Sequence, residues 1–233
     1  MVSPTRSVTT RRILPPLAGV VAFILFPILV WAQHGDHQRR PSDIKEYLEH
    51  LDSSSRDADQ KPSQVVEALG LKSGMAVADL GSGSGYFTRR FVEAVTDTGT
   101  VYAVDVEPEM LAYVKESLEH THAPYRVEFI LARPDDPKLP TGSVDLIFVC
   151  NVFHHLENRS VYFERLKSAL NPGGRIAIVD FYHDDRSGNV GFPKHHLVPR
   201  ETTIAEMTKA GYRLTREHTF LLRQYFLEFT PIP

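Results

Sequence analysis

The feature that most constrains the fold is a glycine-rich turn that follows a short apolar run. Residues 77–87 read Val-Ala-Asp-Leu-Gly-Ser-Gly-Ser-Gly-Tyr-Phe. The apolar run predicts a buried strand, and the segment after the turn has the spacing of a helix. Glycine lets a backbone turn sharply while a ligand approaches it closely. The third glycine is Gly85, one residue earlier than the Gly-x-Gly-x-x-Gly spacing of dinucleotide-binding turns requires.

From this turn onward the pattern alternates between strand and helix. Two strands joined by a short connection, and therefore antiparallel, close the chain. These elements predict an α/β fold with a doubly wound, Rossmann-like, seven-stranded sheet that is mostly parallel and has a C-terminal antiparallel hairpin. The predicted strands are 75–80, 100–105, 125–131, 144–150, 175–181, 212–219 and 223–229, and the predicted helices are 42–51, 62–69, 86–95, 108–120, 159–170 and 202–210.

The N-terminal segment predicts a leader rather than part of this fold. Three arginines precede the apolar stretch 13–32, which ends in residues that a signal peptidase reads. Residues 1–32 are therefore interpreted as a signal peptide cleaved after Ala32, with an uncleaved N-terminal membrane anchor as the alternative. We expect the protein to be exported to the periplasm or held at the inner membrane through residues 13–32. Residues 33–61 then form a linker and a cap helix, and residues 62–233 the main domain.

Composition excludes several classes of partner and site. The net charge of −3 becomes −6 after cleavage, so no general attraction for nucleic acid is expected. Cys150 is the single cysteine, which excludes an intramolecular disulfide and a multi-cysteine zinc site. The sparse histidines at 34, 37 and 50 are not expected to hold a metal, so no metal site is predicted.

A carboxylate stands where the second predicted strand ends. Asp105 follows Gly81 by 24 residues. In doubly wound sheets ligands bind beyond the carboxyl ends of the strands, which places Asp105 to accept the ribose hydroxyls of an adenosine. The alternative is that Asp105 caps the helix beginning near Pro108, and the two roles can coexist.

The order of these motifs resembles class I S-adenosylmethionine-dependent methyltransferases from about Pro62 to the end of the chain. Asp79-x-Gly81-x-Gly83-x-Gly85 resembles the first motif of that family, and Asp105 its ribose-binding position. Asp145 and the turn 171–174, Asn-Pro-Gly-Gly, match the acidic residue of the fourth strand and the turn before the fifth. The sequence 151–155, Asn-Val-Phe-His-His, is most similar to small-molecule type 11 methyltransferases related to quinone-biosynthesis enzymes.

The resemblance implies S-adenosyl-L-methionine as cofactor and methyl transfer to a small-molecule acceptor by in-line displacement. In the family, an aspartate after the third strand contacts the adenine. Here Ala132-Arg133 stands at that place, so Asp135 takes the role after a small loop shift, or else forms a surface cluster with Arg133. The implied cofactor-binding residues are Asp79, Gly81, Ser82, Gly83, Gly85, Asp105, Val106, Asp135 and Asn151. Lys61 is a further candidate, for the methionine carboxylate.

Candidate catalytic residues lie after the fourth and fifth strands. His155 is the expected general base where the acceptor must lose a proton, and Asp180 and Tyr182 are expected to shape the pocket. One of the two adjacent histidines can instead pack against the sheet and bond only to backbone. Two other functions stay open: a non-catalytic nucleoside-binding or sensor module, and a nicotinamide-dependent oxidoreductase, against which the early third glycine argues. The acceptor and the oligomeric state cannot be inferred from the sequence.

Overall fold

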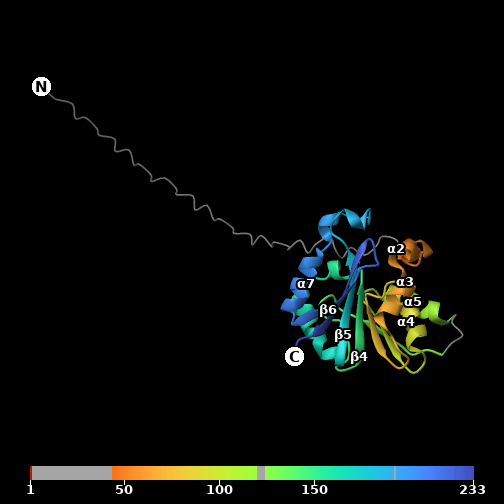
Figure 1. The fold of residues 1–233 in the computed structure, drawn as a ribbon. Helices are drawn as coiled ribbons and strands as arrows, with labels where there is room; N and C mark the ends of the chain where they lie inside the picture. The colour runs from red at the N-terminus through yellow and green to blue at the C-terminus, as the bar shows by residue number, and fades with distance from the viewer. Residues whose placement is uncertain (2–43, 120–123, 192) are drawn as a thin grey trace. The chain divides into compact units, whose positions relative to one another are not determined.

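The computed structural model describes Met1 and residues 44–119, 124–191 and 193–233 (Figure 1). The chain separates into two units, Met1–Asp36 and His37–Pro233, and every described helix and strand belongs to the second. The predicted leader, apart from Met1, lies outside the described residues, as do His34 and His37.

The described residues form one seven-stranded sheet with the order β3-β2-β1-β4-β5-β7-β6. The first five strands pair in parallel, and β7 runs antiparallel to both β5 and β6. The predicted fold class, including the closing hairpin, is therefore confirmed. The strands are β1 (Ala76–Leu80), β2 (Thr100–Asp105), β3 (Val127–Leu131), β4 (Val144–Cys150), β5 (Leu170–Phe181), β6 (Tyr212–His218) and β7 (Gln224–Pro231).

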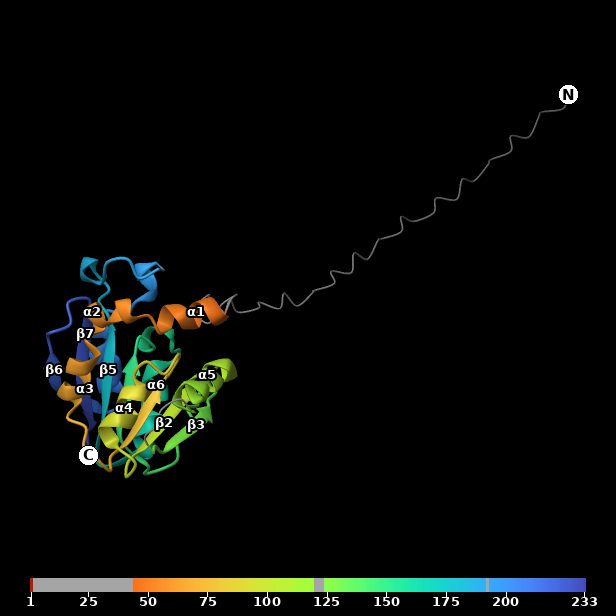
Figure 2. The same ribbon diagram turned by 90° about the vertical axis from the view of Figure 1, so that its right-hand side faces the viewer.

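Helices cover both faces of the sheet (Figures 1 and 2). Successive residues of a strand point to opposite faces, so Val77 and Ala78 of β1 belong to different apolar clusters. The Val77 cluster includes side chains of α3 (Pro62–Leu69), α4 (Thr88–Val95) and α5 (Pro108–Glu119). The Ala78 cluster includes side chains of α6 (Arg159–Leu166) and α7 (Arg200–Lys209). Short elements complete the fold: α1 (Ile44–Leu51), η2 (Ser54–Arg56), α2 (Asp57–Gln60), η3 (Phe153–His155), η4 (Lys167–Ala169), η5 (Asp185–Ser187) and η6 (Lys194–His196).

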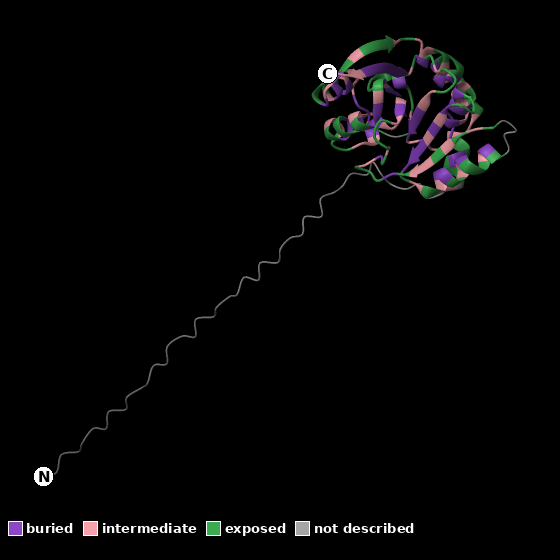
Figure 3. Ribbon diagram, turned by 90° about the horizontal axis from the view of Figure 1, so that it is seen from below, coloured by how far each residue is buried: buried purple, intermediate pink, exposed green. Residues whose placement is uncertain are grey.

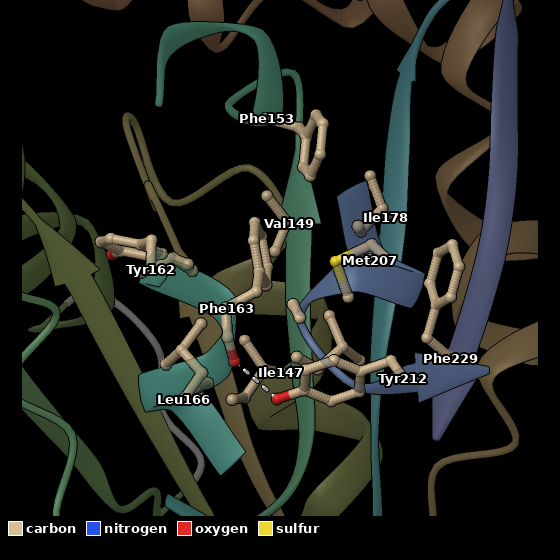
Figure 4. Packing of buried hydrophobic residues seen from close by; sticks show 14 of the residues in the cluster. Ile147, Val149, Phe153, Tyr162, Phe163, Leu166, Ile178, Met207, Tyr212 and Phe229 are labelled. Carbon is tan, nitrogen blue, oxygen red and sulfur yellow. Dashed lines mark hydrogen bonds between the residues drawn. The ribbon is translucent and has the colours of Figure 1, made fainter. Parts of the chain in front are cut away.

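The central strands are buried on both faces, as Figure 3 shows. This explains why their sequences are nearly continuous apolar runs rather than alternating patterns. On the α6–α7 side, the Tyr212 hydroxyl donates a hydrogen bond of 2.9 Å to the Phe163 carbonyl (Figure 4). That bond satisfies the one polar group that Tyr212 brings into the core and links β6 to α6.

The Asn-Pro-Gly-Gly turn differs from its prediction. Helix α6 ends at Leu166, η4 follows, and β5 already begins at Leu170. The register with β4 then jumps from Val144↔Leu170 to Leu146↔Arg175, so residues 171–174 form an irregularity inside β5. Gly173 has a φ of 83°, a value that glycine adopts without strain. The turn therefore interrupts a strand instead of separating a helix from one.

Candidate active site

The glycine turn is held against the end of β2. The N–H groups of Gly81 and Ser82 both donate to the Val104 carbonyl, at 2.7 and 3.0 Å. Gly81 has a φ of +76°, and a Cβ there would lie 2.3 Å from Cγ2 of Val152. Only glycine fits this position, because both its backbone conformation and its contact with the segment after β4 exclude a side chain.

Asp79 is a buried carboxyl group at the end of β1. Its Oδ2 accepts a hydrogen bond of 2.6 Å from the Thr88 hydroxyl at the first residue of α4. Burial raises the pKa of Asp79 to about 7; the Thr88 hydrogen bond opposes this rise, and the nearby Asp105 carboxylate adds to it. Ionised Asp79 is therefore unfavourable in the protein alone, and a cationic ligand beside it would stabilise the charge.

Asp105 couples the turns after β1 and β2. Its Oδ2 accepts from the Gly83 N–H at 2.8 Å, and its Oδ1 accepts from the Glu107 N–H at 3.0 Å. Burial raises the pKa of Asp105, while these backbone hydrogen bonds lower it. Each carboxylate oxygen has two lone pairs, so ribose hydroxyls can still bond to Asp105. The neighbouring Val106 is 47% exposed.

Two serine hydroxyls give an independent test of whether a cofactor fits this turn. The Oγ atoms of Ser82 and Ser84 are buried and have no hydrogen-bond partner among the described residues. Unsatisfied buried hydroxyls are uncommon and costly, which is typical of a surface that a polar ligand completes. Together with Asp105 and the glycines, they make the turn suitable for S-adenosylmethionine.

The end of α1 lies over the glycine turn. A Cβ on Gly83 would be 3.3 Å from Cδ1 of Leu51. Asp52 forms an ion pair with Arg89 and accepts a hydrogen bond of 3.1 Å from the Tyr113 hydroxyl of α5. Arg89 also donates to the Ser84 carbonyl at 2.8 Å. Its guanidinium therefore contacts both the glycine turn and Asp52, the residue directly after α1.

Arg56 is a cation whose charge acts on the buried Asp79 carboxyl group, and the sequence reasoning missed it. Its guanidinium lies 4.3 Å from the centre of the Tyr86 ring and donates to Gln60 Oε1 at 3.0 Å. Its charge is among the influences that lower the pKa of Asp79. Lys61, the candidate from the sequence, instead donates to the Phe220 carbonyl at 2.8 Å. No motif marks Arg56, because its position depends on how the N-terminal helices pack on the sheet.

The remaining predicted cofactor residues fall in two places. Asn151, directly after β4, has a φ of 56°, and its Oδ1 accepts from Gln224 Nε2 at 2.6 Å. Asp135 is exposed, with its carboxylate 3.6 Å from Arg133. This geometry matches the surface-cluster alternative, and a contact from Asp135 to the adenine stays a prediction.

The structure brings two of the three predicted catalytic residues together through His154. Asp180 Oδ1 lies 2.7 Å from His154 Nδ1, and Oδ2 accepts the His154 backbone N–H at 3.1 Å. The centroids of the His154 and His155 rings are 4.1 Å apart. His154 is thus the histidine that packs against the sheet, but its partner is a side chain as well as backbone. Tyr182 is buried, and the centroids of its ring and the Tyr225 ring are 5.8 Å apart. The guanidinium carbon of Arg186 lies 3.5 Å from the centroid of the Tyr182 ring.

A groove of about 690 Å³ opens beside this unit. One wall is η3 and the start of α6, and the other is η6 and one side of α7 as far as its last residue, Lys209. Its lining includes four histidines, from both walls: His154, His155, His195 and His196. A volume of this size accommodates a small organic molecule.

Among the described ranges, no helix combines the length and apolarity that crossing a membrane needs. The described part of the chain also has no group of three or more His, Cys, Asp or Glu side chains that could hold a metal ion.

Comparison with known proteins agrees with the motifs. Residues 78–178 match the family described as methyltransferase domain. The protein of Enterobacter sp. (strain 638) named ubiquinone/menaquinone biosynthesis C-methyltransferase UbiE is 27% identical over 156 residues, covering 66% of this chain and 62% of that protein. The same-named protein of Pseudoalteromonas translucida is 24% identical over 157 residues, with the same coverage. The chain thus spans less than two thirds of the length of these curated relatives.

A solved structure extends the agreement over most of the fold. The SAM-dependent methyltransferase from Aquifex aeolicus superposes with a TM-score of 0.74 at 28% identity, covering 81% of this chain and 98% of that chain. The resemblance inferred from the motifs is therefore confirmed. The motifs, the matched domain and this superposition together support a class I S-adenosylmethionine-dependent methyltransferase.

Proposed function

We propose that this protein transfers a methyl group from S-adenosylmethionine to a small-molecule acceptor. The observation that carries the proposal is the glycine turn: Asp79 precedes it on β1, Asp105 at the end of β2 accepts from its Gly83 N–H, and two of its serine hydroxyls are buried without a hydrogen-bond partner among the described residues. When bound, the cofactor supplies an electrophilic methyl group on a sulfonium. The protein's share is then to bind, orient and exclude water, which can account for much of the rate. Relatives named as quinone-biosynthesis C-methyltransferases support a small-molecule acceptor.

Calorimetric titration of the full chain with S-adenosylmethionine and S-adenosylhomocysteine tests the binding, and transfer of a labelled methyl group to fractions of a cell extract tests the reaction.

Asp105→Asn is expected to weaken S-adenosylhomocysteine binding at least about tenfold, because its amide nitrogen would oppose a backbone N–H donor. Asp97→Asn, at an exposed loop position, is the control and should bind as the wild type does.

Each alternative function has its own outcome in these experiments. Tight cofactor binding without transfer to any fraction would favour the sensor module. Binding of a nicotinamide nucleotide in preference to S-adenosylmethionine would favour an oxidoreductase. Either result would overturn the proposed reaction.

Arg56 is proposed to bind the carboxylate of the cofactor. Arg56→Gln is expected to weaken S-adenosylhomocysteine binding about tenfold to a hundredfold, the usual worth of a hydrogen bond to a charged group. It should also raise the pKa of Asp79 further, because a nearby positive charge is lost. Arg56→Lys keeps the charge and should retain more of the affinity. Equal affinity of Arg56→Gln and wild type, measured by calorimetry, would exclude this role.

We also propose that residues 1–32 export the protein or anchor it in the inner membrane. The basic start, the apolar stretch and the small residues at its end support this proposal. Fusions to a reporter that is active only in the periplasm, together with N-terminal sequencing of the purified protein, test it. A mature protein beginning at Gln33 would indicate cleavage, and an intact N-terminus with membrane retention would indicate an anchor. A full-length protein free in the cytoplasm would refute both.

A further inference from the structure

Gln224 is a buried side chain that uses only part of its hydrogen-bonding capacity. It is the first residue of β7 and is 1% exposed. Its Nε2 donates to Asn151 Oδ1 at 2.6 Å, whereas its Oε1 is buried without a hydrogen-bond partner among the described residues. A buried amide oxygen without a partner destabilises the fold, and an apolar side chain of the same length would avoid that cost. Stability alone therefore does not explain a glutamine here, and its contact with Asn151 is the feature to explain.

Asn151 lies directly after β4, beside the glycine turn. In the parallel pairing of β1 with β4, Leu80 lies opposite Val149, so the two chains continue side by side as Gly81 and Cys150. Asn151 has a φ of 56°, in the left-handed region that asparagine adopts more readily than most residues. Its side chain is held from β7, across the intervening strand β5. The closing hairpin thus fixes a side chain at the edge of the proposed cofactor site.

The same hydrogen bond decides which half of the Asn151 amide is available to a ligand. Oδ1 accepts from Gln224, and Asn151 is half-buried with no further side-chain hydrogen bond among the described residues. The amide nitrogen Nδ2 is a hydrogen-bond donor. Asn151 therefore offers a donor, and not an acceptor, beside the glycine turn.

A second donor is linked to the same strand end. Arg56 donates to Gln60 Oε1 at 3.0 Å, and the Cys150 thiol lies 4.0 Å from that oxygen. Gln60 thus joins Arg56 to the residue directly before Asn151. Arg56 is proposed to bind the carboxylate of the cofactor, and both oxygens of a carboxylate accept hydrogen bonds. Arg56 and Asn151 can each supply a donor to that group.

We propose that Gln224 is a positioning residue for recognition of the amino-acid end of the cofactor. It holds Asn151 so that Nδ2 donates, together with Arg56, to the carboxylate of the bound cofactor. Gln224 itself does not touch the cofactor. This inference rests on the proposed function and adds a selectivity to it: a nucleoside thioether that lacks the amino-acid group gains no affinity from these side chains.

The test compares S-adenosylhomocysteine with 5′-methylthioadenosine, which has the same adenosine and thioether sulfur but no amino-acid group. Calorimetry of the full chain measures both affinities. Gln224→Met keeps the length of the side chain and removes the donor to Asn151. It is expected to weaken S-adenosylhomocysteine binding about threefold to tenfold, the worth of an ordinary hydrogen bond, and to leave 5′-methylthioadenosine binding unchanged. Its unfolding temperature should equal or exceed that of the wild type, because the unpartnered oxygen is gone. Gln64→Met, at an exposed position on α3, is the matched control and should bind as the wild type does.

Asn151→Gly shows whether Gln224 acts through Asn151. Glycine adopts the positive φ without strain and lacks the amide, so S-adenosylhomocysteine binding should weaken about tenfold or more, the worth of a hydrogen bond to a charged group. The double variant Asn151→Gly/Gln224→Met should bind no more weakly than Asn151→Gly alone, because Gln224 then has nothing to position. Additive losses would mean that Gln224 contacts the ligand directly, and would overturn the positioning role.

Two further outcomes count against the inference. Unchanged S-adenosylhomocysteine affinity in Gln224→Met would overturn it, and so would equal losses for the two ligands, because a merely structural role affects both alike. Equal affinity of the wild type for the two ligands would refute recognition of the amino-acid end and leave the proposed function standing. Failure of the wild type to bind S-adenosylhomocysteine at all would instead overturn the proposed function.

Discussion

Asp79→Asn is expected to stabilise the ligand-free protein near neutral pH. Burial raises the pKa of Asp79 from 3.8 to about 7, so between these values the native protein holds a proton that the unfolded chain releases. The free energy of unfolding is therefore highest, with respect to this group, below pH 3.8 and falls as the pH rises toward 7. The full loss is about 4 kcal/mol for a shift of this size. Asparagine keeps a carbonyl oxygen for the Thr88 hydroxyl and carries no charge, so this loss should disappear.

Denaturant unfolding of the wild type and Asp79→Asn measures the difference in their free energies of unfolding. The measurements run from about pH 4 to pH 8, because the pKa of Asp79 is raised from 3.8 to about 7. The two curves should diverge as the pH rises, with the variant the more stable at pH 8. Thr88→Val is the contrasting variant: it removes a hydrogen bond that holds the pKa of Asp79 down, so its free energy of unfolding should continue to fall to a higher pH than that of the wild type. Parallel curves for wild type and Asp79→Asn would contradict the buried, perturbed carboxyl. The variant should also bind the cationic cofactor more weakly, because the ionised carboxylate is lost.

Gly81→Ala is expected to lower the free energy of unfolding by about 2–5 kcal/mol and to abolish measurable S-adenosylhomocysteine binding. Two costs combine: a positive φ that alanine adopts poorly, and a Cβ placed 2.3 Å from Cγ2 and 3.2 Å from Cβ of Val152. Valine is stiff at its first side-chain torsion, so the overlap must move the backbone of one of the two segments. Denaturant unfolding and calorimetry measure the two effects.

Gly142→Ala separates these two costs. Gly142 also has a positive φ, +56°, but no atom lies within 4 Å of the position of its Cβ. This variant should lose only about 1–2 kcal/mol, the conformational term, and bind the cofactor normally. Equal destabilisation by the two variants would show that the contact with Val152 has no energetic weight.

The elements of the fold were predictable where their signals are local. The strands 100–105 and 144–150 and the helix 62–69 have the predicted bounds, because apolar runs bounded by turn residues or an N1 proline determine such elements within a few residues. The segment 171–174 was misplaced because its turn composition is local, whereas its inclusion in β5 depends on pairing with β4. The helix predicted from Tyr86 begins at Thr88, because the backbone of the glycine turn continues through Phe87.

The amino-acid sequence by itself determined the glycine turn: the glycines, Asp79 and Asp105 lie within a single strand–turn–helix–strand unit, where spacing along the chain sets spacing in space. Only the tertiary structure decided which side chains surround that turn. Arg56 reaches it from a separate helical segment, Asp180 meets His154 across 26 residues, and the groove exists because η3 and η6 face each other. These contacts come from the packing of distant segments on the sheet, which no local pattern of residues encodes.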